Sequence, residues 1–434
     1  MRKLFLVTLI SLLFFSLIFL IGNIKSVANQ EGNALQKEYV PNEVLVKFKK
    51  DVLKYYNQEV INSIISVQGK IITYLGKEIS PFVWDRADLS LRSFRLDPDL
   101  FHIKVPETIG TEQAIYILNQ NPNVEYAEKN GIYHVFEKPT DPDYEEHQWA
   151  LGESTIDADI DAPEAWDIFT GSSDIVVALI DSGANYNHDD IEANIWINEG
   201  EIPGNDIDDD NNGYKDDVHG YDFVSGDGDP MDDLGHGTHI AGIVGAEANN
   251  GEGIAGVNWN VKIMLLKIIK FNNEIKASDA IAAIDYATEN GAHLSTNSWG
   301  DDDDFYSTGF AIRRAMDAGK LFIAAAGNYQ NFPWYDNDID PIYPASIDLD
   351  NIISVASTNI LDHLAGHSHY GLHSVDLGAP GKDIYSTLMY GNYGNKSGTS
   401  MAAPHVAGVA ALVLGDRPNL DWWQVKTIIM SRGV

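Results

Sequence analysis

Three short segments carry an acid, an imidazole and a hydroxyl, in that order along the chain. Asp181 ends the apolar run Val-Ala-Leu-Ile, His236 lies in Gly-His-Gly-Thr-His, and Ser400 lies in Gly-Thr-Ser-Met-Ala. Serine is a poor nucleophile until a base takes its proton, and an imidazole held by a carboxylate is such a base. The three segments together predict nucleophilic catalysis by a serine hydroxyl.

Each segment alone also has an ordinary structural interpretation. Asp-Ser-Gly at 181–183 is a typical turn, and Gly-Thr-Ser before an Ala-rich apolar run is a typical helix N-terminus. His236 and His239 are three residues apart, a spacing that suggests zinc. The zinc-protease pattern, however, needs His-Glu-x-x-His, and no Glu is present here. The sequence therefore favours catalysis over a zinc centre.

Composition limits the class of protein. At 434 residues the chain exceeds what one hydrophobic core usually serves, so two domains are expected. The absence of cysteine excludes a disulfide framework, a thiol nucleophile and thiolate metal ligands. Residues 29–138 hold 15 acidic and 13 basic residues, whereas residues 139–434 hold 49 and 13. So acidic a second part argues against nucleic acid or anionic lipid as a partner.

The N-terminus has the pattern of a targeting segment. Arg2 and Lys3 precede an apolar run over residues 4–21, and Ser-Val-Ala at 26–28 offers a small-residue cleavage site. This pattern predicts a signal peptide over residues 1–28 and a secreted, extracellular protein. If the run is not cleaved, it would instead anchor an extracytoplasmic catalytic domain, and contact with a membrane is expected only in that case.

Residues 29–138 are expected to form a small α+β domain. Strands are predicted over 44–48, 101–105 and 123–128, and helices over 50–67 and 111–119. Residues 137–146 contain two prolines and five acids and predict a linker.

From residue 139 onward, apolar runs alternate with helical patterns. The runs predict strands buried on both faces, at 175–180, 261–266, 294–298, 321–326 and 352–356. Helices are predicted between them, at 239–248, 277–290 and 308–318. This alternation predicts an α/β fold with a mostly parallel sheet, whose ligands bind at the carboxyl ends of the strands. Asp181 lies at one such end.

The order Asp181, His236, Ser400, with these flanking residues, resembles the subtilisin-like serine proteases from about residue 141 to the C-terminus. Residues 41–48 and 124–128 resemble the inhibitory propeptide of that family. The resemblance implies a subtilisin-like three-layer α/β/α catalytic domain over 139–434. It also implies that residues 29–138 form the propeptide, an intramolecular chaperone and inhibitor. The expected product is a monomeric, secreted serine endopeptidase, made as a self-processing zymogen and hydrolysing protein or peptide substrates through an acyl-enzyme.

The resemblance also assigns roles to single residues. Ser400 matches the nucleophile, His236 the general base and then acid, and Asp181 the orienting carboxylate. Asn328, which follows an apolar run and a glycine, matches the side-chain donor of the oxyanion hole. The backbone N–H of Ser400 is expected to be the second donor.

Substrate is expected to bind as an extended strand. Ser298, Trp299 and Gly300 resemble the edge of the family's substrate groove, and Ile342 resembles the base of an apolar first specificity pocket. Four aspartates at 301–304 follow directly. They either favour basic side chains at outer subsites or form a solvated loop.

Oxygen-bearing side chains between the Asp and His motifs predict a calcium loop. Positions 1, 3, 5, 7 and 9 of this loop hold Asp208, Asp210, Asn212, Tyr214 and Asp216, with glycine at position 6. The usual Glu at position 12 is absent, and Asp217 is expected to compensate. Related proteases carry a calcium-rich insertion at this place. An acidic solvated loop is the alternative.

A second calcium site is expected at Asp190 together with Asn250, which lies in the loop after the His-motif helix. Asp227, Asp229 and Asp232 are weaker candidate ligands.

Three points stay open on the sequence. Residues 364–371 depart from the family's usual pattern, with an unexplained effect on packing. The chain ends soon after an expected helix over 421–430, so it is either a minimal domain or a fragment of a longer precursor. Because fold does not fix function, a non-catalytic adhesion or scaffolding protein on the same fold is the alternative to an enzyme.

Overall fold

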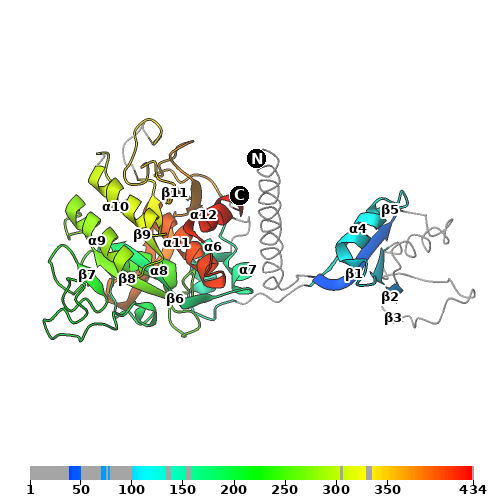
Figure 1. The fold of residues 1–434 in the computed structure, drawn as a ribbon, viewed down its shortest axis with the longest axis horizontal. Coiled ribbons are helices and arrows are strands. Elements are labelled where there is room, and N and C mark those ends of the chain that lie inside the picture. Colours follow the sequence, from blue (N-terminus) through cyan, green and yellow to red (C-terminus); the bar gives the residue numbers. More distant parts are fainter. Residues whose placement is uncertain are drawn as a thin grey trace, which may run out of the picture. The chain divides into compact units, whose positions relative to one another are not determined.

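The computed structural model describes most of the chain, namely residues 39–49, 70–74, 77–78, 100–132, 138–152, 158–303, 306–328 and 335–432. The expected signal peptide over 1–28 and the expected helix over 50–67 lie outside these residues. The chain divides into two compact units, Met1–Val135 and Phe136–Val434 (Figure 1). Among the described residues, no helix has both the length and the apolar composition needed to cross a membrane.

The first unit is a five-stranded antiparallel sheet with a helix packed against it. The strand order is β3-β2-β4-β1-β5. Its elements are β1 (Tyr39–Phe48), β2 (Lys70–Tyr74), β3 (Lys77–Glu78), β4 (Leu100–Lys104), α4 (Gly110–Asn119) and β5 (Val124–Gly131). Val44, Val46 and Phe48 alternate inward along β1 and pack with Leu118 of α4, so the predicted alternation places one face of the sheet against the helix.

The second unit is built on a seven-stranded sheet in which every pair of neighbouring strands is parallel. The order is β12-β11-β10-β9-β6-β8-β7, with β6 (Gly171–Asp181), β7 (Gly220–Asp222), β8 (Asn260–Lys267), β9 (Leu294–Asn297), β10 (Leu321–Ala325), β11 (Ile352–Thr358) and β12 (Leu377–Pro380). The five predicted strands form the centre of this sheet. Apolar periodicity missed only the short outer strands β7 and β12, which have few residues to show a pattern.

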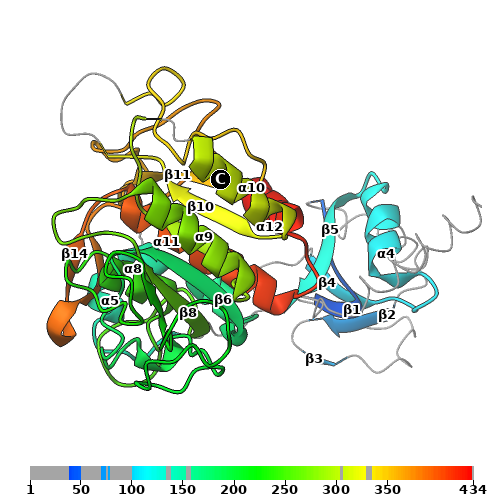
Figure 2. The same ribbon diagram turned by 60° about the vertical axis from the view of Figure 1, so that its left-hand side comes forward.

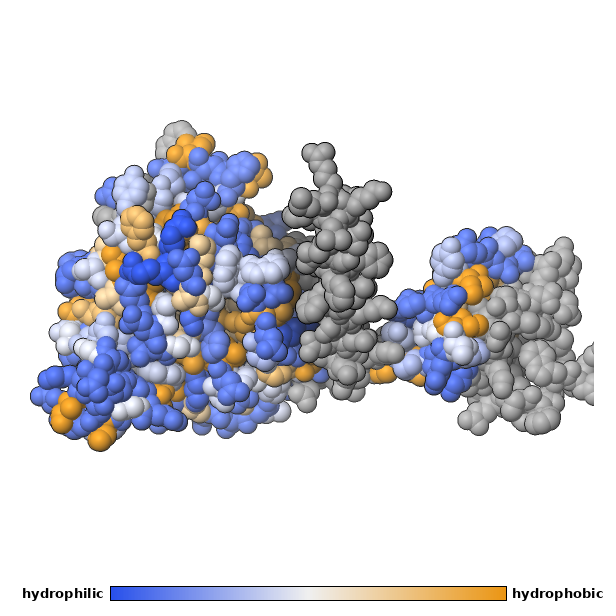
Figure 3. Space-filling view, in the orientation of Figure 1, coloured by the Kyte–Doolittle hydropathy of each residue, from blue (hydrophilic) through white to orange (hydrophobic). Residues whose placement is uncertain are grey.

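Helices cover both faces of this sheet, which confirms the predicted three-layer α/β/α fold (Figures 1 and 2). The helices of this unit are α5 (Tyr144–His147), α6 (Trp149–Gly152), α7 (Ala162–Trp166), α8 (Gly237–Gly245), α9 (Ala277–Glu289), α10 (Tyr306–Asp317), α11 (Thr399–Asp416) and α12 (Trp422–Arg432). Successive side chains of β6 point to opposite faces, so Val177 and Leu179 pack with α8 and α11, whereas Ala178 and Ile180 pack with α9 and α10. The visible face of this unit is mostly hydrophilic, with scattered apolar side chains (Figure 3).

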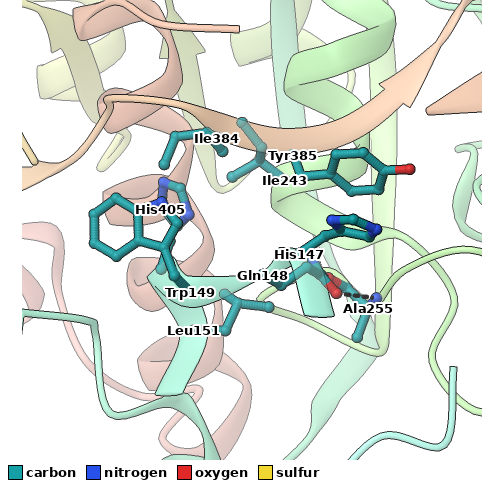
Figure 4. Close-up of a pocket in the computed structure, with 10 residues that line it drawn as sticks. His147, Gln148, Trp149, Leu151, Ile243, Ala255, Ile384, Tyr385 and His405 are labelled. Carbon is teal, nitrogen blue, oxygen red and sulfur yellow. Dashed lines mark hydrogen bonds between the residues drawn. The ribbon is translucent and has the colours of Figure 1, made fainter. Parts of the chain in front are cut away.

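The linker expected over 137–146 is wrong for its second half. Asp141 and Tyr144 are buried, and α5 begins at Tyr144. The next residues are held in place as well: Gln148 exchanges two hydrogen bonds with the backbone of Ala255, at 2.7 and 2.8 Å, and the His147 ring stacks on Tyr385 (Figure 4). The cavity between these residues measures about 10 Å³, room for a water molecule and no more.

Candidate active site

The three motif residues reach one region of the second unit from three elements. Asp181 is the last residue of β6, His236 directly precedes α8, and Ser400 is the second residue of α11. His236 and Ser400 line one cavity of about 490 Å³, and Asp181 is buried behind the imidazole. Parallel strands place their carboxyl ends along one edge of a sheet, so the expectation drawn from the end of β6 agrees with the structure.

The imidazole and the carboxylate form a close pair. His236 Nδ1 lies 2.7 Å from Asp181 Oδ1, which also accepts the backbone N–H of Ser182 at 2.7 Å. Burial by itself lowers the pKa of His236, but the charge and hydrogen bond of Asp181 outweigh burial and raise it above the ordinary value. Because Nδ1 faces Asp181, the other ring nitrogen, Nε2, is available to groups in the cavity.

Asp232 fixes the loop that carries the imidazole. Its two oxygens accept the Ser182 hydroxyl at 2.8 Å, the N–H groups of Leu234, Gly235 and Thr238 at 2.8 to 3.0 Å, and the Thr238 hydroxyl at 2.6 Å. Ser182 Oγ in turn accepts the N–H of Gly237 at 2.9 Å. These donors give Asp232 a structural role in this loop, and its weaker candidacy as a calcium ligand stays a prediction.

Ser298 supports the backbone at Ser400. Pro404 lies inside α11 and has no N–H, so the carbonyl of Ser400, four residues earlier, lacks its helical partner. The Ser298 hydroxyl donates to that carbonyl at 3.0 Å. Ser298 was expected at the groove edge, and the structure adds this second contact.

Asn328 is oriented so that its amide can act as a donor in the cavity. The N–H of Thr399 donates to Asn328 Oδ1 at 2.8 Å, which directs Nδ2 away from that contact. The preceding glycine, Gly327, has φ +116°, and a side chain there would meet Ile342 at 3.0 Å. Asn328, Ser400 and Ile342 all line the cavity.

The two carbonyls before Asn328 are held by residues that the sequence did not point to. Asn337 Nδ2 donates to the Ala326 carbonyl at 2.8 Å, and its Oδ1 lies 2.7 Å from His369 Nδ1. The backbone N–H of His369 donates to the Gly327 carbonyl at 3.0 Å. Burial lowers the pKa of His369, so its ring stays neutral at pH 7. The divergent segment 364–371 thus packs against the Asn328 loop.

The expected groove edge and the expected pocket segment lie side by side. Asp301 and Tyr343 exchange two backbone hydrogen bonds, at 2.9 and 2.8 Å. Trp299 and Gly300 line both the 490 Å³ cavity and a neighbouring cavity of about 220 Å³, which Pro344 also lines. The structure therefore brings Ser298, Trp299, Gly300 and Ile342 to the cleft that contains Ser400.

The predicted calcium loop gathers carboxylates, with one addition. Oxygen atoms of Asp208, Asp210 and Glu201 lie within 4.8 Å of one another. Glu201 precedes the loop and fits no loop position, so no pattern in the sequence pointed to it. These are hard oxygen donors of the kind that Ca²⁺ prefers.

The other members of the loop also make hydrogen bonds that shape its backbone. Asp216 accepts the N–H groups of Asn205 and Asp206 at 3.0 and 2.8 Å, and Asn212 Oδ1 accepts the N–H of Tyr214 at 2.8 Å. Asp217, expected to compensate for the missing ligand, does not join the group of Glu201, Asp208 and Asp210, and its role as a ligand stays a prediction. Asp217 is buried, and its oxygens accept hydrogen bonds from two asparagine side chains and from Tyr286.

The second expected calcium site contains two buried carboxylates. Asp190 accepts Asn250 Nδ2 at 2.8 Å and the N–H of Ile254 at 3.0 Å. Burial raises the pKa of Asp190 to about 6, and the nearby charge of Asp141 adds to this effect. Asp141 Oδ1 is buried and has no hydrogen-bond partner among the described residues. Asp141 Oδ2 accepts the N–H of Asn249 at 2.8 Å, so only one oxygen of this carboxylate lacks a donor. Two buried carboxylates whose charges act on one another are costly unless a cation joins them, and this donor set fits a hard cation.

A parallel α/β fold whose cleft is lined by a serine and by an imidazole paired with a carboxylate defines a class of serine hydrolases. This chain belongs to the subtilase family, because the model of that family (peptidase S8) matches residues 172–432, and it is a serine endopeptidase.

Individual relatives agree with this membership. The chain is 37% identical over 357 residues to the thermophilic serine proteinase of Bacillus sp. (strain AK1), covering 81% of this chain and 79% of that one. It is 35% identical to subtilisin-like protease 1 of Plasmodium berghei (strain Anka), covering 67% of this chain and about half of that relative's length. Among solved structures, a protease from Pseudoalteromonas arctica PAMC 21717 has a TM-score of 0.56 and 30% identity, covering 68% of this chain and 92% of that one.

Proposed function

We propose that Ser400 is the nucleophile of this endopeptidase, with His236 as its base and Asp181 as the carboxylate that orients the imidazole. Ser400 Oγ attacks the scissile carbonyl carbon while His236 Nε2 takes its proton, and the same proton passes to the departing amine. Water then attacks the acyl-enzyme with His236 again as the base, which releases the acid product and restores Ser400. The observation that carries the assignment is the 2.7 Å His236–Asp181 hydrogen bond beside a cavity that Ser400 lines.

The negative charge of the tetrahedral intermediate falls to two donors. Asn328 Nδ2 is one, supported by the Thr399 N–H that holds Asn328 Oδ1. The N–H of Ser400 is the other, because the first N–H groups of a helix have no partner within the helix. Donors fixed before the reaction need no reorganisation when the charge develops.

Substrate binds along the groove edge in an extended form. The acyl half lies against Ser298, Trp299 and Gly300, and its side chain next to the scissile bond enters an apolar pocket at Ile342. The neighbouring cavity beside Trp299 takes a more distant side chain of the acyl half. The proposed substrates are therefore proteins or peptides with an apolar residue before the cleaved bond.

A serine-directed covalent inhibitor tests the assignment. Wild-type protein should form one adduct on Ser400, and the S400A variant should be unlabelled and inactive. S397A is the matched control, because Ser397 is exposed and bonds to Asp383 outside the cavity, and it should keep both labelling and activity. If the folded, processed wild type forms no adduct, the enzyme assignment fails and a non-catalytic protein on this fold remains.

We further propose that calcium stabilises the second unit. Glu201, Asp208 and Asp210 would hold one ion, together with oxygens from Asn212, Tyr214 and Asp216; Asp190, Asn250 and Asp141 would hold another. Ca²⁺ supplies positive charge where carboxylates would otherwise repel one another. Melting in calcium and in chelator tests this, since an ion that binds only the folded state raises the melting temperature. An unchanged melting temperature would refute it.

Finally, we propose that the protein is an exported zymogen, with residues 1–28 as a signal peptide and 29–138 as an inhibitory propeptide. A separate compact α+β unit preceding the enzyme supports the second point. N-terminal sequencing of secreted protein should find a start after residue 28 in S400A and a later start in wild type. Separation of the first unit that persists in S400A would mean that another protease performs the processing.

A further inference from the structure

Lys396 lines the candidate active-site cavity and has no role in the proposed triad. Lys396 ends β14 (Asn392–Lys396), which pairs with β13 (Ile384–Leu388), and it lies four residues before Ser400. It lines the same cavity as His236, Leu234 and Ser400. Its side chain is half-buried, so its charge stands at the wall of the cleft and not in bulk solvent.

The charge of this cavity is opposite to that of the unit around it. Residues 139–434 carry 49 acidic and 13 basic residues, yet none of the described residues that line the cavity is an Asp or Glu. Among the described residues that line the cavity, Lys396 is the one lysine, so its ammonium contributes a positive charge to the cavity wall. A cleft walled by low-dielectric groups focuses such a field, so one uncompensated ammonium matters here more than on an open surface.

The carboxylates whose charges act on Lys396 are already held by other groups. Asp181 and Asp232 both raise the pKa of Lys396, against a larger lowering by burial, so both lie within electrostatic range. Asp181 is hydrogen-bonded to His236, and Asp232 accepts four donors of its own loop and the Ser182 hydroxyl. Within the described part of the chain, no carboxylate lies within 4 Å of the Lys396 ammonium, in contrast to Lys267, which has Asp233 at 3.2 Å.

The position of Lys396 selects one side of the scissile bond. His236 must hand its proton to the departing amine, so the first residue of the leaving peptide lies against the imidazole. The β13–β14 hairpin that carries Lys396 packs against α8, the helix that His236 directly precedes: His239 Nε2 lies 3.1 Å from the Gly394 carbonyl of β14. The charge of Lys396, two residues further along β14, acts on His236. The acyl half is proposed to lie along Trp299 and Ile342, which belong to other segments of the cavity wall.

We propose that Lys396 is a specificity-determining residue that binds an Asp or Glu side chain of the substrate just after the scissile bond. The substrate carboxylate would pair with the Lys396 ammonium, which has no carboxylate partner among the described residues. This ion pair would form at a partly desolvated cavity wall, where its interaction energy is larger than on the open surface. This inference rests on the proposed catalytic roles of Ser400 and His236, and it adds a substrate class that the triad does not define.

The test uses processed enzyme and peptides that differ only in the residue after the scissile bond, as Asp, Asn, Ala or Lys. Wild type should cleave the Asp peptide with a kcat/KM about fivefold above that of the Asn peptide, which corresponds to about 1 kcal/mol. The ratio should fall toward one in K396Q, reverse in favour of Lys in K396E, and shrink for wild type in high salt, because salt screens a partly exposed pair.

Two controls distinguish a failure of the Lys396 proposal from a failure of the proposed catalytic activity on which it rests. K262Q removes a lysine near the amino end of β8, where it donates to the Ala193 carbonyl at 2.6 Å, and should keep the wild-type ratio. Each variant is normalised to its rate on a peptide p-nitroanilide, which has no side chain after the scissile bond. Wild-type inactivity on that substrate would refute the protease assignment itself. An active wild type with equal rates on Asp and Asn peptides, or a preference that survives in K396Q, would overturn the role of Lys396 alone.

Discussion

The hydroxyl of Ser298 donates a hydrogen bond to the backbone carbonyl of Ser400, at 3.0 Å. This bond replaces the one that Pro404 cannot make, since proline has no N–H to offer the carbonyl four residues before it. A strand-end residue of the groove therefore completes the first turn of the helix that carries the candidate nucleophile. This hydrogen bond therefore links the edge of the substrate groove directly to the backbone of Ser400.

Replacing Ser298 by alanine should destabilise the fold. The Ser400 carbonyl would lose its partner in a buried place, at a cost of about 1–3 kcal/mol in the free energy of unfolding. The measurement is urea unfolding in the S400A background, which prevents self-digestion. S298T keeps the hydroxyl and should recover most of the loss; an S298A variant within about 0.5 kcal/mol of its parent would contradict the argument.

The sequence predicted those features of the fold and site that short stretches of consecutive residues determine. Asp181, His236, Ser400 and Asn328 each stand in a short motif whose neighbours shape the local backbone, so their arrival at one region of the fold was predictable. The structural role of Asp232 was missed, because its donors come from the loop conformation and from Ser182, 50 residues away, neither of which composition shows.

Residues separated in the chain gave no such signal. Asp141 reaches Asn249, 108 positions away, and was assigned to a linker because prolines and acids surround it. Asn337 and His369 are 32 residues apart and stabilise a third segment. Such contacts depend on how elements pack, which periodicity does not encode.

Asn337→Ala should slow catalysis more than it weakens substrate binding. Losing Asn337 frees the Ala326 carbonyl and the His369 ring, and Asn328 would then sample orientations that miss the developing oxyanion. We expect kcat to fall about tenfold or more, or ~1.4 kcal/mol in the barrier, with little change in KM. Steady-state kinetics on a p-nitroanilide measures both.

The matched control is Asn351→Ala. Asn351 is equally buried and donates to the Lys320 carbonyl at 3.0 Å, just before β10, whereas Ala326 lies just beyond its other end. Both variants should lose stability, but only N337A should lose kcat. Equal losses of kcat would show that Asn337 acts through general stability and not through the Asn328 loop.

Activity should rise with pH along a curve set by His236. The imidazole must be neutral to accept the Ser400 proton, and Asp181 raises its pKa, so the midpoint of kcat/KM should lie above the ordinary value of about 6.5. Lys396 opposes this effect, and K396Q should therefore move the midpoint to higher pH. A pH–rate profile on the p-nitroanilide decides; a midpoint that moves down in K396Q would show that the ammonium does not act on His236.

The raised pKa of His236 also makes the stability of the fold depend on pH. A base whose folded pKa lies above its unfolded value stabilises the fold below the unfolded pKa, and this contribution is lost as pH rises through the folded pKa. The charged His236–Asp181 pair therefore adds to stability on the acid side. Unfolding of S400A at several pH values checks this term without self-digestion.

Asp190→Asn should have opposite effects with and without calcium. In chelator the variant removes a buried charge that lies beside Asp141, so the melting temperature should rise above that of the parent. In calcium it removes a ligand and should lower the melting temperature. Asp189, the exposed neighbour, provides the control D189N, which should be close to the parent in both conditions.

The pH dependence of stability in the metal-free protein is an independent test of whether Asp190 is a buried charge that a cation compensates. Because burial raises the folded pKa of Asp190 to about 6, its ionisation destabilises the fold as pH rises from the unfolded value of about 4 through 6. Parent protein in chelator should thus be less stable at pH 7 than at pH 5, and D190N should lose most of that difference. Added Ca²⁺ should abolish the loss at pH 7 in the parent only. If D190N melts below the parent in chelator as well as in calcium, Asp190 is a structural hydrogen-bonding residue and not a cation ligand.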